Sequence, residues 1–516
     1  MSGADELDEA IALANSGRTR PAAPPVPRLK RIRRIQWSEA DAGPGQPEEE
    51  AAVPRDPADG ATDGATDGPP PARDADRDAK EPGVAARTRG PERPSWPEAR
   101  ALAAGTPGAL PRVTLPLDRA LDHTLAGPLE ALTDLPSFDT SAMDGWAVSG
   151  PGPWELVPGP GGTGGTGGSG STGGSGGTSG QGILAGDRTE PAPLPDGHAV
   201  RIATGARIPP NASAVLRSEH GATSGASRLR TARAPQPGTD IRPRGQECRT
   251  GDELLPGGTR VTPAVLGLAA AAGYDELEVV RRPRAEVLVL GDELLHRGLP
   301  REGRIRDALG PLMGPWLTTL GADVIVTRRL GDDAEALYET LATTTADVVV
   351  TTGGTAAGPV DHLQPTLRRL GAELLVHGVR VRPGHPMLLA ALRKRSEGIG
   401  EEGGGGTFLV GLPGNPLAAL SGLVTLAAPL LRTLGGRPGP GHEQQGTLAE
   451  EVPGHPRDTR LVPVAHEGAG VRARVRPLRY AGPSMLRGIA TADALAVIPP
   501  GGAAPGTDVR LLELPR

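Results

Sequence analysis

The chain has 516 residues, and its 76 glycines and 56 prolines make up about a quarter of them, against roughly 12% in average usage. Only 5 Trp, 3 Tyr and 2 Phe supply the aromatic content. These proportions exclude one compact domain of this length and indicate several domains diluted by low-complexity sequence. A net charge of −6 argues against a general nucleic-acid binder.

The remaining composition indicates a cellular compartment. The single cysteine, Cys248, excludes an internal disulfide and a multi-cysteine metal site, which suits a reducing cytosol. The acidic N-terminus has no apolar signal core. No apolar run approaches the roughly 20 residues that span a bilayer. We therefore expect a cytoplasmic protein with no membrane partner.

Residues 1–98 are predicted to form a disordered tail. They show almost no apolar periodicity, and 59–68 is a small repeat of Asp, Gly, Ala and Thr. Such sequence cannot bury enough apolar surface to offset the entropy of ordering it. The basic cluster at 28–34 could bind RNA or anionic lipid, but a solvated run of charge is the favoured interpretation.

A second diluting segment is the linker at 159–182, with 14 glycines among 24 residues. We interpret it as a flexible insertion in a surface loop, because lengthening such a loop costs little free energy. A phosphate-binding glycine loop is disfavoured, since no helix follows. Residues 398–406 resemble a shorter insertion of the same kind.

From residue 284 the sequence alternates strand and helix signals. Helices are expected near 307–320, from 332 and up to about 434, and the expected strands are 285–290, 322–327, 347–352, 373–376, 387–392 and 407–410. This rhythm predicts a doubly wound α/β sheet. Ligands of such sheets bind beyond the carboxyl ends of the strands.

Glycine turns follow three of these strands, at 291–293, 353–355 and 411–416. Backbone N–H groups in such turns can approach an anion closely. The glycines could instead merely turn the chain. Three such turns at one rim favour a site for a phosphate-bearing ligand.

The flanking regions give weaker signals. Residues 117–125 predict a short helix, and 136–148 contain Asp139 and Asp144 in a turn that could hold a cation or only cap the chain. After residue 435, short strand-like pieces at 460–464, 471–475 and 494–498 indicate a small β-domain.

Seven motifs occur in the order found in the MoeA family of molybdopterin molybdenumtransferases, which includes the C-terminal part of gephyrin. The chain resembles this family over about 99–516, at residues 136–148, 201–209, 242–247, 291–294, 347–354, 382–384 and 411–416. The order of seven motifs is specific, although each alone is weak. The CinA-like relatives share only the doubly wound domain and lack the first motif.

The resemblance implies four domains after the tail. A mixed α/β domain I comprises 99–148 and 242–283, and an inserted β-rich domain II comprises 149–241 with the linker. A molybdopterin-binding, doubly wound domain III covers 284–436, and a small C-terminal β-barrel, domain IV, covers 437–516.

The implied reaction inserts molybdate into adenylated molybdopterin and releases AMP, with Mg²⁺ as cofactor. The resemblance also implies a homodimer with an active site shared between subunits, and a possible molybdopterin adenylyltransferase partner.

The resemblance also assigns site residues. The implied catalytic residues are Asp144, Thr204, Glu293, Asp332 and Asp361, and the last three would hold the metal or the diphosphate. Asp144 and Thr204 would come from the partner subunit. For Asp332 and Asp361 a helix-start role remains an alternative. The implied cofactor-binding residues are Gly353, Gly354, Thr355, Arg382, Gly384, His385, Gly411, Gly414 and Asn415.

Two departures from the family pattern bear on activity. His385 replaces a lysine and is mostly neutral near pH 7, and Ala356 replaces a serine. These losses motivate the alternative of a non-catalytic molybdopterin- or nucleotide-binding paralogue with a regulatory or scaffolding role. The retained carboxylates favour the active transferase.

Overall fold

The structure is a computed structural model that describes residues 93–159, 182–225, 227–355, 361–392, 406–439, 444–468 and 474–515. Contacts divide the chain into two units, 1–86 and 87–516, and all described residues belong to the second. The basic cluster at 28–34, most of the linker and most of the insertion at 398–406 lie outside the described residues.

Helix α2 (Trp96–Gly105) begins inside the range predicted to be disordered. Ser95 and Glu98 form a capping box, in which each side chain bonds the backbone N–H of the other. The Trp96 side chain is 2% exposed, and its indole N–H donates to Thr425 Oγ1 at 3.0 Å. The predicted tail boundary at residue 98 is therefore wrong, because a contact 329 residues away along the chain anchors this helix.

Domain III contains the predicted doubly wound sheet, which the structure confirms. Its strand order is β17-β14-β18-β22-β21-β19. Neighbours are parallel from β17 to β22, and β21 runs antiparallel to both of its neighbours, β22 and β19. The strands are β14 (Arg284–Leu290), β17 (Asp323–Leu330), β18 (Val348–Thr352), β19 (Glu373–His377), β21 (Leu388–Leu392) and β22 (Thr407–Leu412). A short pair, β15 (Leu294–Leu295) and β16 (Ile305–Arg306), follows β14.

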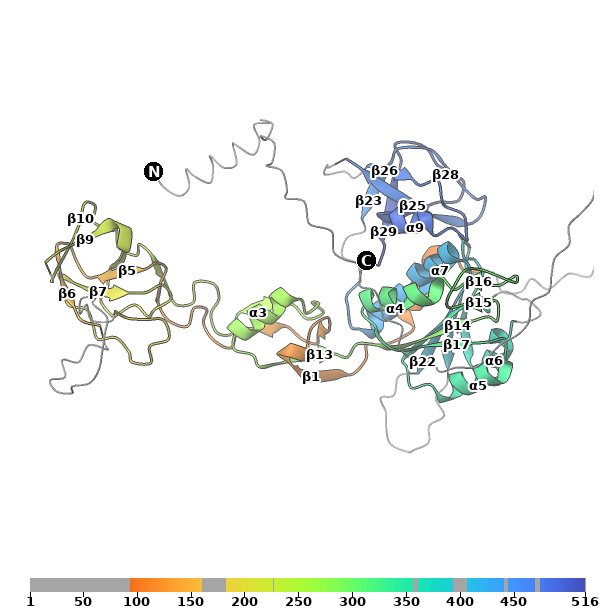
Figure 1. Cartoon of the computed structure of the whole chain (residues 1–516), viewed down its shortest axis with the longest axis horizontal. Helices are drawn as coiled ribbons and strands as arrows, with labels where there is room; N and C mark the ends of the chain where they lie inside the picture. The colour runs from red at the N-terminus through yellow and green to blue at the C-terminus, as the bar shows by residue number, and fades with distance from the viewer. Residues whose placement is uncertain are drawn as a thin grey trace, which may run out of the picture. The chain divides into compact units, whose positions relative to one another are not determined.

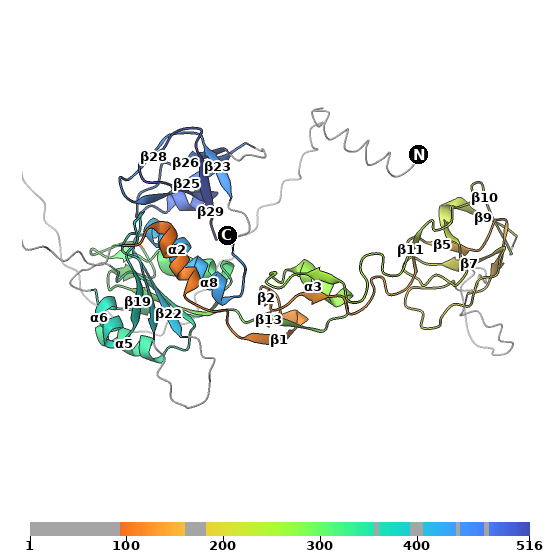
Figure 2. The same cartoon turned by 180° about the vertical axis from the view of Figure 1, so that it is seen from behind.

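Helices cover both faces of this sheet (Figure 1). One face packs on α5 (Ala334–Thr343) and α6 (Leu363–Arg369) through residues such as Leu288 and Val349. The other face packs on α2 and on a further group of helical segments: α4 (Leu309–Thr319), α7 (Pro416–Gly422), a π-helical turn (Leu423–Ala427) and α8 (Ala428–Leu434). Figure 2 shows α2 beside α8.

The prediction that no apolar run approaches a membrane-spanning length is wrong for Pro416–Leu434. This stretch is the only helix in the described part of the chain that is long and apolar enough to cross a membrane. Its apolar window is 83% buried, and its leucines belong to the core under the sheet. A buried core helix of a globular protein meets the same length and composition criteria, so this finding is weak evidence for a membrane span.

Domain I has a three-stranded sheet of order β1-β13-β2, covered by α3 (Pro263–Ala271). The helix predicted at 117–125 is wrong: a short 3₁₀ turn (Leu117–Arg119) is followed by strand β2 (Thr124–Leu125). Asp122 between them has φ 66°, which an α-helix does not permit. The other strands are β1 (Arg112–Pro116), β13 (Glu276–Val280), and the pairs β3 (Leu129–Glu130) with β12 (Glu253–Leu255) and β4 (Thr140–Ser141) with β11 (Ile241–Arg242).

Domain II is a six-stranded sheet of order β8-β5-β7-β6-β10-β9. The strands are β5 (Gly145–Val148), β6 (Trp154–Val157), β7 (His198–Ile202), β8 (Ala214–Arg217), β9 (Gly221–Ser224) and β10 (Arg228–Thr231), and a 3₁₀ turn (Ser218–His220) joins β8 to β9. Its β-rich character agrees with the expectation for the inserted domain.

Domain IV is a closed five-stranded barrel, as predicted. The order is β25-β26-β23-β29-β27, and β27 pairs back on β25. The strands are β23 (Gln445–Leu448), β25 (Thr459–Glu467), β26 (Arg474–Pro477), β27 (Ala494–Ile498) and β29 (Asp508–Glu513), with α9 (Arg487–Thr491) and the pair β24 (Val452–Pro453) and β28 (Gly502–Ala503) beside them. Strand β20 (Val381–Arg382) of domain III pairs with β25.

The linker interrupts one line of strand pairing in domain II. Val157 pairs with Val200 of β7, and Ile183 pairs in the same parallel sense with Ile202. The two flanks are thus two register positions apart, about 7 Å at the rise of a strand. The three residues 158, 159 and 182 can span that distance.

Deleting residues 160–181 is therefore expected to leave domain II folded. Its free energy of unfolding should be unchanged or raised by up to about 2 kcal/mol, because the shorter loop closes at a lower entropic cost. Urea denaturation of the deletion variant, beside a variant with a Gly/Ser segment of equal length, measures this. Loss of folding in the deletion variant alone would refute the interpretation as a simple insertion.

Candidate functional site

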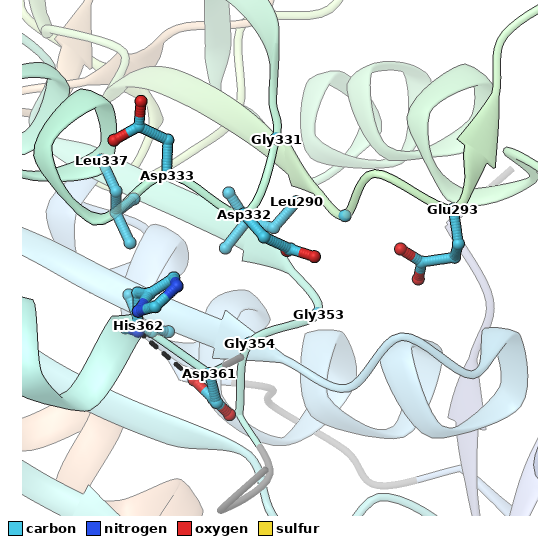
Figure 3. Close-up of a pocket in the computed structure, with 12 residues that line it drawn as sticks. Leu290, Glu293, Gly331, Asp332, Asp333, Leu337, Gly353, Gly354, Asp361 and His362 are labelled. Atoms are coloured by element: carbon cyan, nitrogen blue, oxygen red, sulfur yellow. Dashed lines mark hydrogen bonds between the residues drawn. The ribbon is translucent and has the colours of Figure 1, made fainter. Parts of the chain in front are cut away.

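A cleft of about 310 Å³ lies where β14, β17 and β18 end. These three strands are neighbours and parallel, so their carboxyl ends meet at one edge of the sheet. The lining residues come from the turns after the strands and from the start of α6: Leu290, Gly291, Glu293, Gly331, Asp332, Asp333, Leu337, Gly353, Gly354, Asp361, His362 and Leu363. We call this the strand-end cleft (Figure 3).

Glycine is required at the floor of the strand-end cleft. Gly353 and Gly354 have φ of 93° and 70°, in the left-handed region that favours glycine. Gly291 has φ 128°, and a Cβ there would lie 2.3 Å from Glu293 Oε2. The Glu293 carboxylate therefore lies against the turn that follows β14.

Asp332 and Asp333 have different surroundings. Asp333 is the N-cap of α5, and its Oδ1 accepts from the N–H groups of Glu335 and Ala336 at 2.9 and 3.1 Å. Figure 3 shows the Asp332 carboxylate directed toward Glu293 and the Asp333 carboxylate directed away. Of the two alternatives for Asp332, the capping role thus belongs to its neighbour.

Asp361 combines a structural contact with an unsatisfied oxygen. Its Oδ1 accepts from Leu363 N–H at 3.3 Å, at the start of α6. Its Oδ2 is buried and has no hydrogen-bond partner among the residues that the structure describes. Burial raises the pKa of this carboxyl, against smaller opposing effects of the Leu363 N–H and of His362. A buried, unpaired carboxylate oxygen is costly unless a ligand satisfies it.

A second cleft of about 320 Å³ lies between domains III and IV, and we call it the arginine cleft. Its lining includes residues from the end of β20 and the loop after it, from the N-cap of α7 and from strand β25: Arg382, Gly384, His385, Asn415 and Arg460. Gly384 has φ 103°, and a Cβ there would meet the Ala418 carbonyl oxygen at 2.7 Å. Four of the predicted cofactor-binding residues thus come together here rather than in the strand-end cleft.

Cations dominate the electrostatics of the arginine cleft. Arg382 Nε lies 2.7 Å from Asp458 Oδ2, which orients its guanidinium. Burial lowers the pKa of His385, and the charges of Arg382 and Arg93 lower it further, so the imidazole is neutral at pH 7. Ser484 donates to Asn415 Oδ1 at 2.8 Å and holds that amide.

The predicted residues Gly411, Gly414 and Thr355 line neither cleft. Gly411 belongs to β22, where a Cβ would meet Leu388 Cγ at 2.7 Å and Thr355 Cγ2 at 3.0 Å. Thr355 itself is 5% exposed. A Cβ on Gly414 would lie 3.8 Å from Gly353 Cα. These residues pack between the two clefts, and ligand contact by Thr355 stays a prediction.

Asp144 and Thr204 form their own contact in domain II. Thr204 N–H donates to Asp144 Oδ1 at 2.7 Å, because β5 and β7 pair with Gly145 opposite Ile202. Hydrogen bonds from the Thr204 backbone and side chain lower the pKa of Asp144. Within the described residues of one chain, no hydrogen bond or ion pair joins this pair to either cleft.

Sequence reasoning missed Arg460 and Arg93. Arg460, on β25, lines the arginine cleft although it lies 78 positions after Arg382 in the sequence. Arg93, in the segment before α2, lowers the pKa of His385 through its charge. Neither stands in a motif of the chain. Only the pairing of β20 with β25 brings Arg460 to Arg382.

The donor set of the strand-end cleft suits Mg²⁺ shared with a ligand. In the described part of the chain, no three His, Cys, Asp or Glu side chains form a ready-made metal group. Mg²⁺ usually takes one or two carboxylates and completes its shell with water and substrate phosphates. Asp332 and Glu293 offer such carboxylates, and the buried Asp361 Oδ2 still lacks a partner.

Three family models match the chain. The "MoeA N-terminal region (domain I and II)" matches residues 95–273, the "Probable molybdopterin binding domain" matches 286–433, and the "MoeA C-terminal region (domain IV)" matches 445–514. Together they cover nearly all of the body that the structure describes.

Curated relatives and a solved structure agree with this assignment. A molybdopterin molybdenumtransferase of Staphylococcus aureus is 30% identical over 64% of this chain and 73% of its own length. Molybdopterin molybdenumtransferase 2 of Mycobacterium tuberculosis is 31% identical over 75% and 91%. The molybdopterin biosynthesis MoeA protein of Pyrococcus horikoshii has a TM-score of 0.61 and 23% identity, covering 82% of this chain and 100% of its own, which shows the shared fold.

The fold, the strand-end cleft and these matches define a multidomain enzyme of molybdenum cofactor biosynthesis. Within that class, the chain belongs to the MoeA family of molybdopterin molybdenumtransferases.

Proposed function

We propose that this transferase inserts molybdate into adenylated molybdopterin and releases AMP, with the diphosphate in the strand-end cleft. The observation that carries the proposal is the convergence of Glu293, Asp332 and Asp361 beside the Gly353–Gly354 backbone at one sheet edge. Glycine turns can present N–H groups to phosphate, and carboxylates can hold the cation that neutralises it.

The charge of the strand-end cleft supports a divalent cation. Four carboxylates line it, and within the described residues no lysine or arginine does. A diphosphate would be repelled there unless Mg²⁺ lay between it and the carboxylates. Asp332, Glu293 and the free oxygen of Asp361 would hold Mg²⁺, which when bound stabilises negative charge on the phosphates.

The arginine cleft is suited to bind a second anionic group, next to the strand-end cleft. Arg382 and Arg460 are permanent cations on one wall, and Gly414 packs on Gly353 between the two clefts. We assign Arg382, Gly384, His385 and Asn415 to the pterin phosphate or the molybdate. The Asp144–Thr204 pair would complete the reaction centre from the partner of a cytosolic homodimer.

The experiment incubates the purified chain with adenylated molybdopterin, Mg²⁺ and molybdate, and measures AMP and molybdenum cofactor. Turnover that stops with EDTA and returns with Mg²⁺ is the expected result. Tight binding of adenylated molybdopterin without AMP release would reject the transferase mechanism in favour of a binding paralogue.

Replacing His385 with lysine is expected to keep or raise activity above pH 7. The pKa of His385 is lowered, so its positive charge is lost as pH rises through that value, whereas lysine stays charged. Since the charge of His385 is lost below about pH 6.5 as the pH rises, the pH profile of AMP release should fall less steeply over that range in the variant. A large loss of activity above pH 7 would refute a phosphate role at this position. His466→Lys, at an exposed histidine of β25 that lines neither cleft, is the histidine control.

A further inference from the structure

A third cavity, of about 470 Å³, is lined by five arginines and lies outside both clefts described above. The arginines come from α2, domain I, the end of α8, the segment after α8, and β29: Arg100, Arg260, Arg432, Arg437 and Arg510. Among its lining residues in the described part of the chain, Glu513 is the only acid. A chain of net charge −6 thus concentrates positive charge in one concave place.

Arg437 forms the floor of this arginine pocket. Its guanidinium donates to the carbonyl oxygens of Leu320 at 3.4 Å and Asp122 at 3.2 Å. Burial lowers the pKa of Arg437, and the charges of Arg260 and Arg432 lower it further. The protein therefore holds a partly buried cation beside other cations, an arrangement that an anion in the pocket would stabilise.

The other arginines are fixed by packing. The Arg100 and Arg510 guanidinium groups lie over the Trp96 ring, 5.0 and 5.3 Å from its centroid, and Arg100 also donates to the Val424 carbonyl. Arg260 pairs with Asp122 at 2.6 Å. Guanidinium groups held in this way lose little further freedom when they bind a ligand.

The carboxylate in the pocket is already engaged. Glu513 Oε1 accepts from Gln444 Nε2 at 2.5 Å. Arg432, which is exposed, bonds only the Pro438 carbonyl, at 3.4 Å, among the contacts described. Its remaining donors are available to a ligand.

We propose that the arginine pocket binds a polyphosphate chain, either inorganic or carried by a nucleotide. Planar guanidinium forks match phosphate oxygens in pairs, and several of them around one cavity suit a ligand with several charges. Trp96 is 2% exposed and lies beneath two arginines, so it offers no free face for a base. The phosphate chain is what the pocket recognises, and it would link α2, α8 and β29.

The test measures binding of inorganic triphosphate to the full chain by calorimetry, without Mg²⁺, and the accompanying change in melting temperature. We expect Arg432→Gln to weaken binding about tenfold, the effect of losing one charged hydrogen bond. Glu513→Gln should tighten binding several-fold, because it removes the one acid. Both residues are exposed, so neither change should disturb folding.

Arg474→Gln, at an exposed arginine of β26 that lines none of these cavities, is the matched control and should leave triphosphate binding unchanged. Arg382→Gln is measured beside it to detect triphosphate bound in the arginine cleft instead. ATP should bind as tightly as inorganic triphosphate, and molybdate or sulfate more weakly. The proposal is overturned if the unmodified chain does not bind triphosphate, or if Arg382→Gln rather than Arg432→Gln weakens binding. ATP binding tenfold more tightly than triphosphate would overturn recognition through the phosphates alone.

Discussion

Replacing Asp332 with asparagine is expected to lower kcat for AMP release about a hundredfold to a thousandfold, the range for removing one preorganised electrostatic group from an active site. Asp332 lines the strand-end cleft with its carboxylate directed toward Glu293. An amide keeps the shape and loses the charge that holds Mg²⁺. The Mg²⁺ concentration for half-maximal activity should rise in parallel, measured by AMP release in a Mg²⁺ titration.

Asp333→Asn is the matched control, since it makes the same chemical change one residue along. Asp333 caps α5 through two backbone N–H groups, and asparagine caps a helix about as well as aspartate. Activity should stay within about threefold of the parent, and stability within about 0.5 kcal/mol. Equal losses in the two variants, or full activity of Asp332→Asn, would contradict the assignment of Asp332.

Replacing Trp96 with alanine is expected to lower the free energy of unfolding by about 3–5 kcal/mol, the usual cost of deleting a buried aromatic side chain. Trp96 is 2% exposed, belongs to the core under the domain III sheet and donates to Thr425. Urea denaturation followed by circular dichroism measures the change, read on the transition of domain III.

Trp96→Phe separates packing from hydrogen bonding. Phenylalanine fills most of the same volume and loses only the bond to Thr425 Oγ1, so a smaller cost of about 1–3 kcal/mol is expected. An unchanged stability of Trp96→Ala would show that α2 is dispensable to the domain and would restore the boundary at residue 98.

The sheet of domain III could be predicted because its strands have a local signal. The segment 347–352 is apolar and β-branched after Asp347, as a strand buried on both faces requires, and the structure buries all five residues of β18. Strand ends in a parallel sheet meet at one edge, so the sequence could group Glu293 with Gly353, whereas Asp332 was assigned only by the family resemblance.

Local signals failed where a distant contact decided the conformation. The leucines at 117–125 have helical spacing, yet β2 pairs with β13, whose Val279 lies opposite Leu125. Trp96 stands in a proline-rich stretch that resembles the tail, yet its helix docks on residues more than 300 positions away. Sequence periodicity reflects only residues that are close along the chain. It therefore cannot reveal the pairing of β2 with β13 or the contact of Trp96 with Thr425.

The sequence by itself determined the doubly wound sheet and the glycine turns at its strand ends, since these follow from periods and motifs within short windows. The carboxylates proposed for the site followed from the family resemblance. Only the tertiary structure decided that the predicted ligand residues divide between two clefts, that Asp333 rather than Asp332 caps α5, and that Arg460 faces Arg382. The tertiary structure also brings five arginines, spread over some 400 residues of sequence, into one pocket. Charges so far apart in sequence become neighbours only when packing of the core fixes the elements that carry them.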